Sequence, residues 1–265
     1  MFTDKLRDTK LRLLATLKDY NFDTKKDEVV EVVNELSALW RESLAFSTEK
    51  DFVPSKSNLF IGEWKMISAP QFPGRIFDEN KPDKFQYTLG RVSFNLFEPR
   101  KAVVTILHPE GVKNYVHEIS GEEDKKKCTY NLLSQVVVHT EDGDLPAELL
   151  MEGYCFPETE YRLKIGFYAG TLRKSPKVDK VDILSKRWHS VFDGIYANAE
   201  GDLSYGEIAM RWISKKVLDM TMPSDKSMKF EMKRVFHGYL DILFLDEDMR
   251  ITIGNRGSIV ITVKD

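Results

Sequence analysis

Few residues in this chain have the types and spacing that catalysis or metal binding requires. Its two cysteines, Cys128 and Cys155, lie outside any recognisable nucleophile motif. Five histidines are present, but they never stand at a ligand spacing such as H-x-x-x-H; they are His108, His117, His139, His189 and His237. We therefore predict no catalytic residue, no metal site and no cofactor.

One acidic cluster, Asp246-Glu247-Asp248, could in principle serve as a metal or acid–base site. A turn explains the same residues more simply, because short acidic side chains cap backbone N–H groups or pair with a nearby cation. Arg250 is the nearest such cation in the sequence. We favour the turn.

Composition narrows the function classes further. The chain has 265 residues and a formal net charge of -3, so it has no overall positive field and we expect no nucleic-acid partner. It has no apolar run long enough to span a membrane. The 16 Phe and 9 Met residues fit an ordinary core, or a pocket for an apolar ligand, which such side chains line well.

The cysteine count and the N-terminus bear on the compartment. Two cysteines in a chain of this length indicate reduced thiols, although a single bridge stays open. Residues 1–5 show neither a signal peptide nor a transit peptide. A cytoplasmic location is therefore expected if this N-terminus is complete.

The first part of the chain has helical periodicity. Leucines at helical steps predict a short amphipathic helix over residues 4–19. Thr24-Lys25-Lys26-Asp27 fits a helix start signal, and a second helix is predicted to about Leu44. We divide the chain into a helical segment with a linker, 1–58, and a β domain, 59–265. The helices are expected to pack outside the β domain or to plug one end of it, with a lipid-surface role as the alternative.

Period-2 patterns dominate after residue 59. Strands are predicted at Phe60–Ile67, at Phe85–Phe97 with a bulge at Gly90, and at 102–107, 114–119, 129–140, 148–156, 161–172, 228–236 and 239–244. A turn is predicted over residues 141–146. Residues 183–192 could be helix or strand, and 205–218 are predicted to be helical.

The last residues predict a β-hairpin. Met249, Ile251 and Ile253 alternate with Arg250 and Thr252, and a second alternating run follows the turn at 254–257. Because the chain ends inside that second strand, we expect it to complete a sheet begun near Gly62–Ile67. Many short strands with few helices between them favour an antiparallel barrel of about eight strands, wide enough for one small ligand.

The same hairpin carries a family resemblance. Leu245-Asp246-Glu247-Asp248-Met249-Arg250-Ile251, followed by Gly254-Asn255-Arg256-Gly257-Ser258, closely resembles the C-terminal signature of the plastid lipid-associated proteins, the PAP/fibrillin family. Leu36, Leu39 and Gly62-Glu63-Trp64 resemble the front of the family's domain. The resemblance covers about residues 29–70 and 239–265.

The resemblance implies a lipocalin-like β-barrel preceded by a two-helix segment. It also implies binding of a prenylquinone, a carotenoid or another lipid, and association with a plastid thylakoid or plastoglobule. Gly62-x-Trp64 is similar to the Gly-x-Trp that opens lipocalin barrels, where an Arg from the last strands covers the Trp. Arg250 is the matching Arg. The positions implied to be structural are Gly62, Trp64, Asp246, Asp248, Arg250, Gly254 and Gly257.

Three functions remain open. The first is a non-enzymatic lipid-binding protein whose partner is a hydrophobic small molecule or lipid, with peripheral contact to a membrane or lipid droplet. Its predicted cavity residues are Phe94, Phe97, Tyr154, Phe167, Phe230 and Met232. The second is a small enzyme or chromophore lyase on the same scaffold, with Cys128, Cys155 or His189 as its reactive group. The third is a protein-interaction adaptor that uses its N-terminal helices.

Overall fold

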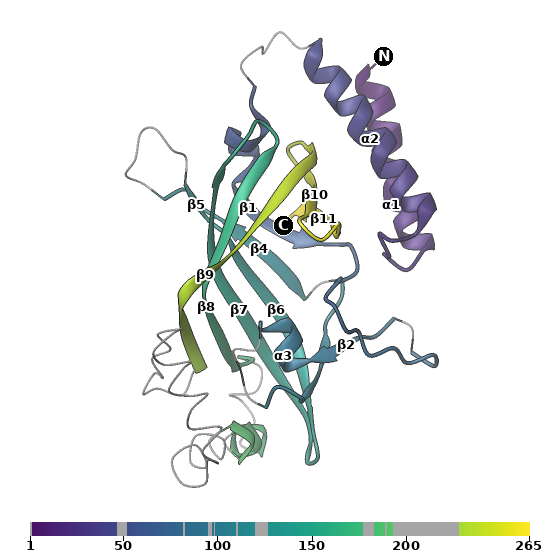
Figure 1. Cartoon of the computed structure of the whole chain (residues 1–265). Coiled ribbons are helices and arrows are strands. Elements are labelled where there is room, and N and C mark those ends of the chain that lie inside the picture. Colours follow the sequence, from purple (N-terminus) through teal and green to yellow (C-terminus); the bar gives the residue numbers. More distant parts are fainter. Residues whose placement is uncertain are drawn as a thin grey trace.

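The chain folds into a mainly β structure with two helices at its N-terminus (Figure 1). The computed structural model describes residues 2–46, 52–81, 83–94, 97, 99–109, 111–119, 127–176, 183–188, 190–192 and 228–265. Two short 3-10 helices, η1 (Pro54–Lys56) and η2 (Asn58–Phe60), connect the helices to the first strand.

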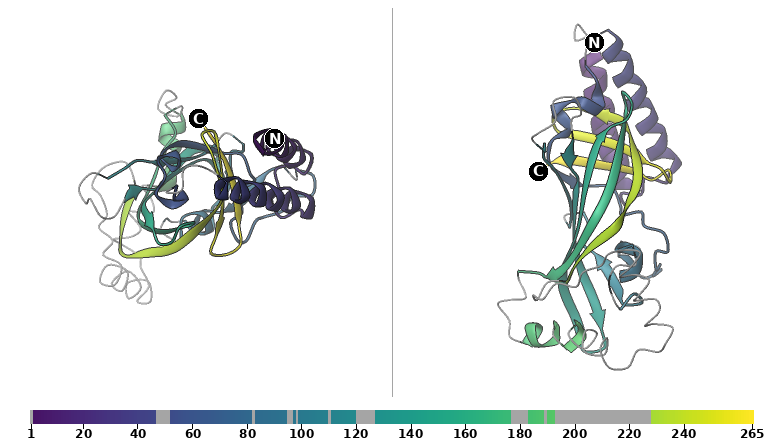
Figure 2. Two further views of the ribbon diagram at one scale, coloured as in Figure 1. Left: turned by 90° about the horizontal axis from the view of Figure 1, so that it is seen from above. Right: turned by 60° about the vertical axis from the view of Figure 1, so that its left-hand side comes forward.

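The two long helices lie side by side on one side of the sheet, as the view from above shows (Figure 2). They are α1 (Phe2–Asp19) and α2 (Asp27–Ala45). Leu13 and Leu17 of α1 are buried with Val33 and Leu36 of α2. The ring of Trp40 lies 5.8 Å from that of Phe244. The helices therefore pack against the outside of the strands.

The predicted start signal of α2 does not form. Lys26 occupies the N-cap position, and no side chain caps the helix. Thr24 is buried instead, and its hydroxyl donates a hydrogen bond of 2.8 Å to the carbonyl of Ile259. A hydrogen bond to a strand therefore replaces the local cap, because Thr24 faces the sheet.

Eight antiparallel strands close into a ring. Around the ring the order is β1–β11–β10–β9–β8–β7–β6–β4 and back to β1. Their bounds are β1 (Gly62–Met66), β4 (Val112–Val116), β6 (Asn131–Thr140), β7 (Gly143–Pro157), β8 (Arg162–Lys174), β9 (Met228–Leu245), β10 (Met249–Gly254) and β11 (Ile259–Lys264). This confirms the expected lipocalin-like barrel.

The last strand joins the first, as the sequence predicts. β11 pairs with β1 in antiparallel register, with Trp64 opposite Lys264. The turn before β11 is closed by a 2.9 Å hydrogen bond from the amide of Gly257 to the carbonyl of Gly254. Gly257 has a φ of 76°, which a residue with a side chain rarely adopts.

A second group of elements extends the structure beyond the ring. Strands β2 (Phe85–Thr88) and β3 (Val103–Ile106) continue the sheet along β6, and β5 (Cys128–Thr129) pairs with the far end of β7. The core accordingly has two clusters. One joins the barrel to α1 and α2 around Trp64 and Trp40, and the other lies between β2, β3 and the lower halves of β6 and β7 around Tyr87.

Several predicted strand limits are wrong. Phe85–Phe97 is a strand only to Thr88, and Leu89–Val92 form the short helix α3. Gly90 is therefore in a helical turn and not in a bulge, because Leu89 and Val92 are both buried from one helical face. The strands predicted at 228–236 and 239–244 are one strand, β9.

The turn predicted over 141–146 is also shorter. β7 already begins at Gly143, and Pro146 lies within it opposite Val137. Proline is tolerated there because pairing with β8 begins only at Ala147. Residues 183–188 and 190–192 are helical, whereas the helix predicted over 205–218 lies outside the described residues.

A loop separates β3 from β4. The amide of Leu107 donates to the carbonyl of Gln135, and the amide of Gln135 donates to the carbonyl of Gly111. His108 and Pro109 lie outside this ladder. His108 Nε2 lies 3.0 Å from the carbonyl oxygens of both Ile67 and Ser68. Two acceptors at one nitrogen require that Nε2 carries the proton.

The hairpin β10–β11 buries both of its faces. Ile251 and Ile261 are register partners in the cluster that includes α1 and α2. Arg250 and Thr262, on the opposite face, are also buried and point into the ring. The apolar face is therefore the outer one, covered by helices, and the inner face of this wall is polar.

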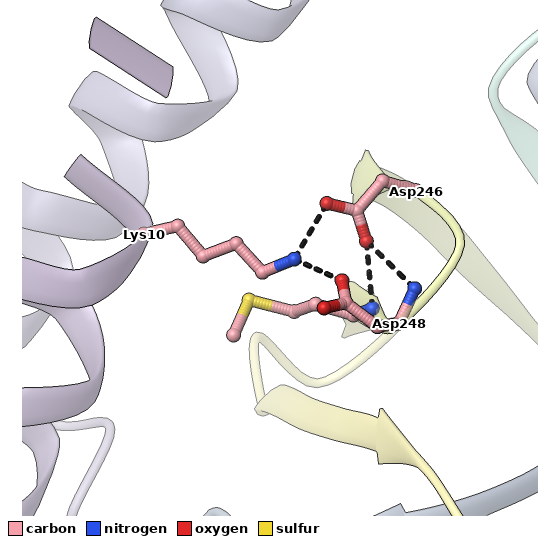
Figure 3. Close-up of polar contacts among 4 residues, drawn as sticks. Lys10, Asp246 and Asp248 are labelled. Carbon is pink, nitrogen blue, oxygen red and sulfur yellow. Dashed lines mark hydrogen bonds and ion pairs between the residues drawn. The ribbon is translucent and has the colours of Figure 1, made fainter. Parts of the chain in front are cut away.

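A turn between β9 and β10 fastens α1 to the barrel (Figure 3). Asp246 accepts hydrogen bonds from the amides of Asp248 (3.1 Å) and Met249 (2.7 Å), which confirms the capping role. Lys10 Nζ lies 2.7 Å from Asp246 and also pairs with Asp248. The alternative prediction, that these acidic residues pair with Arg250, is wrong, because the Arg250 side chain lies inside the barrel.

We expect the substitution Lys10→Met to lower the free energy of unfolding by about 1–2 kcal/mol, since it removes charge-assisted hydrogen bonds and leaves two carboxylates side by side. Lys18→Met, at an exposed position of the same helix, is the control and should change stability little. Urea unfolding followed by circular dichroism measures both. Equal effects of the two substitutions would show that Lys10 does not fasten α1.

His108 should make stability depend on pH. Burial lowers the pKa of His108, so the unfolded chain binds this proton first as the pH falls. The stability that His108 contributes is present above the unfolded pKa of about 6.5 and is lost below it, by at most about 1.4 kcal/mol per pH unit. His108→Gln should flatten this slope, and His237→Gln, at an exposed site, should not. Unfolding at pH 7.5 and 5.5 checks this, and an unchanged slope in His108→Gln would contradict it.

Candidate ligand-binding site

Arg250 is the most unusual residue inside the barrel. It lies on β10, only 2% of its surface is exposed, and no carboxylate is paired with it among the residues that the structure describes. Burial lowers the pKa of Arg250, but a guanidinium keeps its proton in proteins. The ring of strands therefore encloses a positive charge.

Two aromatic rings hold the guanidinium. Its Cζ lies 4.8 Å from the ring centroid of Trp64 and 4.5 Å from that of Phe60. The predicted contact between Arg250 and Trp64 is therefore present. Trp64 is itself fixed, because its indole N–H donates a 3.0 Å hydrogen bond to the carbonyl of Phe60. The short helix η2 thus closes one end of the barrel over this cation.

The hydrogen bonding of Arg250 is incomplete. Nη2 donates a 2.7 Å hydrogen bond to Asn114 Oδ1, and Asn114 is held by its own donation to the carbonyl of Asn131. Nε and Nη1 are buried and have no acceptor among the described residues. Buried polar groups are normally satisfied, and a buried charge that lacks partners is costly. Cation–π contacts offset part of that cost but accept no hydrogen bond.

Two titratable groups near Arg250 have raised pKa values. Burial raises the pKa of Tyr130. A hydrogen bond with Cys128, followed by burial, holds the pKa of Cys155 well above its ordinary value. Cys128 and Cys155 are register partners on β5 and β7, and both are buried without a disulfide between them. Neither Tyr130 nor Cys155 therefore supplies a counter-charge to the guanidinium at neutral pH.

A run of aromatic rings leads from this centre to the surface. The rings of Tyr130 and Phe167 are 6.1 Å apart, and those of Phe167 and Phe94 are 5.9 Å apart. Exposure rises along the run, from 7% at Tyr130 to 40% at Phe94. Phe167 packs against both core clusters, so the run passes between them.

The six predicted cavity residues separate into four groups, of which Tyr154 is one by itself. Phe94 and Phe167 come together in the aromatic run. Phe97 is fully buried in the second cluster, against which Phe167 also packs. The backbones of Phe230 and Met232 lie in β9, but their side chains lie outside the described residues, as does His189.

Tyr154 lies on the outer face of the barrel. Its neighbour Cys155 is buried in the core, and strand alternation places Tyr154 on the opposite side. The Tyr154 ring covers Gly166, where an added Cβ would come within 2.7 Å of that ring. It stacks at 6.2 Å on Phe156, with Lys127 4.8 Å away.

Sequence reasoning missed Asn114, Tyr130 and Phe60. Asn114 is polar although the other buried positions of its strand, Val112 and Val116, are apolar, and this is a signal that the sequence offers. Tyr130 is the single residue between β5 and β6 in the sequence. Phe60 belongs to η2 and not to the predicted strand. Their relation to Arg250 depends on ring closure, which no local pattern reports.

No group of three metal-ligating side chains occurs within the described part of the chain. Among the helices described there, none is long and apolar enough to cross a membrane. Comparisons of the chain with protein-family models, with curated proteins and with solved structures gave no match.

We expect Arg250→Met to fold with a stability within about 2 kcal/mol of the parent protein, because an apolar side chain of similar length removes a poorly paired buried charge. Arg250→Ala should lose more, about 2–5 kcal/mol, since it leaves a cavity beside Trp64. Urea unfolding measures both. A loss in Arg250→Met as large as in Arg250→Ala would show that the guanidinium is needed for the fold itself.

Proposed function

We propose that this protein is a non-enzymatic carrier of a hydrophobic small molecule, bound with its polar end at Arg250. In this proposal Arg250, which the family resemblance implies to be structural, also contacts the ligand. The observation that carries the proposal is the buried guanidinium, whose Nε and Nη1 have no acceptor within the described residues. An oxygen atom of a ligand would supply the missing acceptor. The run Tyr130–Phe167–Phe94 offers apolar contact for the rest of such a molecule.

The type of barrel supports the same proposal. An eight-stranded antiparallel barrel is compatible with binding one small apolar ligand in its interior. The resemblance of the β10–β11 hairpin to the plastid lipid-associated proteins favours a prenylquinone or a carotenoid. Of these two, a prenylquinone fits Arg250 better, because its carbonyl oxygens accept hydrogen bonds and a hydrocarbon carotenoid has no acceptor.

The state of the thiols supports a carrier over an enzyme. A thiol reacts as its thiolate, and reactive cysteines are partly exposed with lowered pKa values. Cys155 is 1% exposed, and its pKa is raised. Cys128 is 5% exposed. The resemblance further suggests a plastid location and peripheral contact with a thylakoid or a lipid droplet, and these stay within the proposal.

The experiment is a lipid extract of the protein purified without detergent, analysed by mass spectrometry and absorption spectroscopy. We expect one apolar molecule at near-stoichiometric amount on the parent protein. Arg256→Met, at an exposed position of the β10–β11 turn, should retain it, and Arg250→Met should lose most of it.

An empty protein would overturn the proposal if its tryptophan fluorescence also stayed constant on titration with a prenylquinone, with a carotenoid and with a single-chain lipid. If Arg250→Met and Arg256→Met retain the bound molecule equally, the protein is still a carrier, but Arg250 is not part of the binding site.

A further inference from the structure

The charge at the Arg250 site narrows the ligand class further than hydrophobicity does. The guanidinium is buried, and no carboxylate is paired with it among the described residues. Several other cations of the barrel wall have acidic partners nearer the surface: Arg162 lies 2.6 Å from Asp241, and Arg173 lies 2.8 Å from Glu148. Arg250, by contrast, is buried and faces the interior, where a charge without a counter-ion is most costly.

The polar atoms around Arg250 can orient a ligand but cannot neutralise the cation. Asn114 accepts one hydrogen bond and is neutral. Thr262 is register partner to Arg250, and its hydroxyl is directed to the Arg250 carbonyl at 3.3 Å, so it does not serve the guanidinium. Trp64 and Phe60 cover the guanidinium with ring faces, which attract a cation but leave its charge in place.

We propose that the ligand is a single-chain amphiphile with one negative charge, a long-chain monocarboxylate, whose carboxylate pairs with Arg250. Guanidinium and carboxylate match in geometry, and their charge-assisted hydrogen bonds are about twice as strong as neutral ones. One carboxylate neutralises one guanidinium, whereas a doubly charged phosphate monoester would leave an excess charge buried. The chain of the ligand lies along Tyr130, Phe167 and Phe94, toward the exposed end of the run.

This inference rests on the proposed carrier function and decides between ligands that the function leaves open. A neutral prenylquinone would supply a hydrogen-bond acceptor at one edge of the guanidinium but would leave its charge without a counter-ion. A monocarboxylate would supply both an acceptor and the counter-charge. The carboxylate head therefore replaces the quinone as the polar end that fits this site best.

The test compares three probes of equal chain length, a C16 monocarboxylic acid, its methyl ester and the corresponding alcohol, by competition against a fluorescent apolar probe at pH 7.5. We expect the acid to bind at least about tenfold more tightly than the ester and the alcohol, which corresponds to one charge-assisted pair. In Arg250→Met the preference for the acid should be lost or reversed, because the carboxylate would then be buried without a counter-charge. In Arg256→Met the preference for the acid should be unchanged.

Arg250→Lys gives a second variant, in case Arg250→Met does not fold. It keeps the charge but not the planar fork, so it should retain a smaller preference for the acid. Equal affinity of the parent protein for acid, ester and alcohol would overturn the monocarboxylate and leave the carrier function standing. Displacement by none of the three, together with no binding of the fluorescent probe, would overturn both.

Discussion

The barrel is built around a buried positive charge. Arg250 projects from β10 into the ring, between Trp64 of β1 and Phe60 of η2, and donates a hydrogen bond to Asn114 of β4. These contacts join the last strands of the chain to the first, at the place where the ring closes. Two nitrogen atoms, Nε and Nη1, have no acceptor among the described residues. The side chain that lies where the ring closes is therefore also the one on which the proposed ligand site rests.

The helices are part of the same constraint. Because Arg250, Thr252 and Thr262 occupy the inner face of the hairpin, its isoleucines must face outward, and an uncovered apolar sheet face would aggregate. The α1–α2 pair covers this face. The ion pairs from Lys10 to Asp246 and Asp248 fix the pair at the turn next to Arg250 (Figure 3). A polar interior on one wall thus requires a helical cover outside that wall.

Much of this architecture could be predicted from local pattern, and the site only in part. Alternation in 249–263 predicts the hairpin, and Gly62-x-Trp64 with Arg250 predicts the pairing of first and last strands, because period and register are local properties. Asn114 and Tyr130 could not be assigned to Arg250, since they meet it only through strand pairings distant in sequence. The same limit explains why Tyr154 is predicted to line the cavity but lies on the outer face. Its strand alternates regularly, and only the burial of Cys155 shows which face is internal. Thr24 likewise followed a local capping pattern that a contact with Ile259 overrides.

The most direct measurement is the NMR signal of the Arg250 side-chain Nε–H in protein labelled with ¹⁵N-arginine and stripped of lipid, assigned by comparison with Arg250→Met. In the free protein, the account predicts a signal typical of an N–H without an acceptor. Addition of a C16 monocarboxylate should shift that signal in a saturable way, with the signal of exposed Arg256 unchanged. A signal that stays in place while the monocarboxylate binds, or that already shows a strong hydrogen bond in the stripped protein, would contradict the claim that a ligand completes this site.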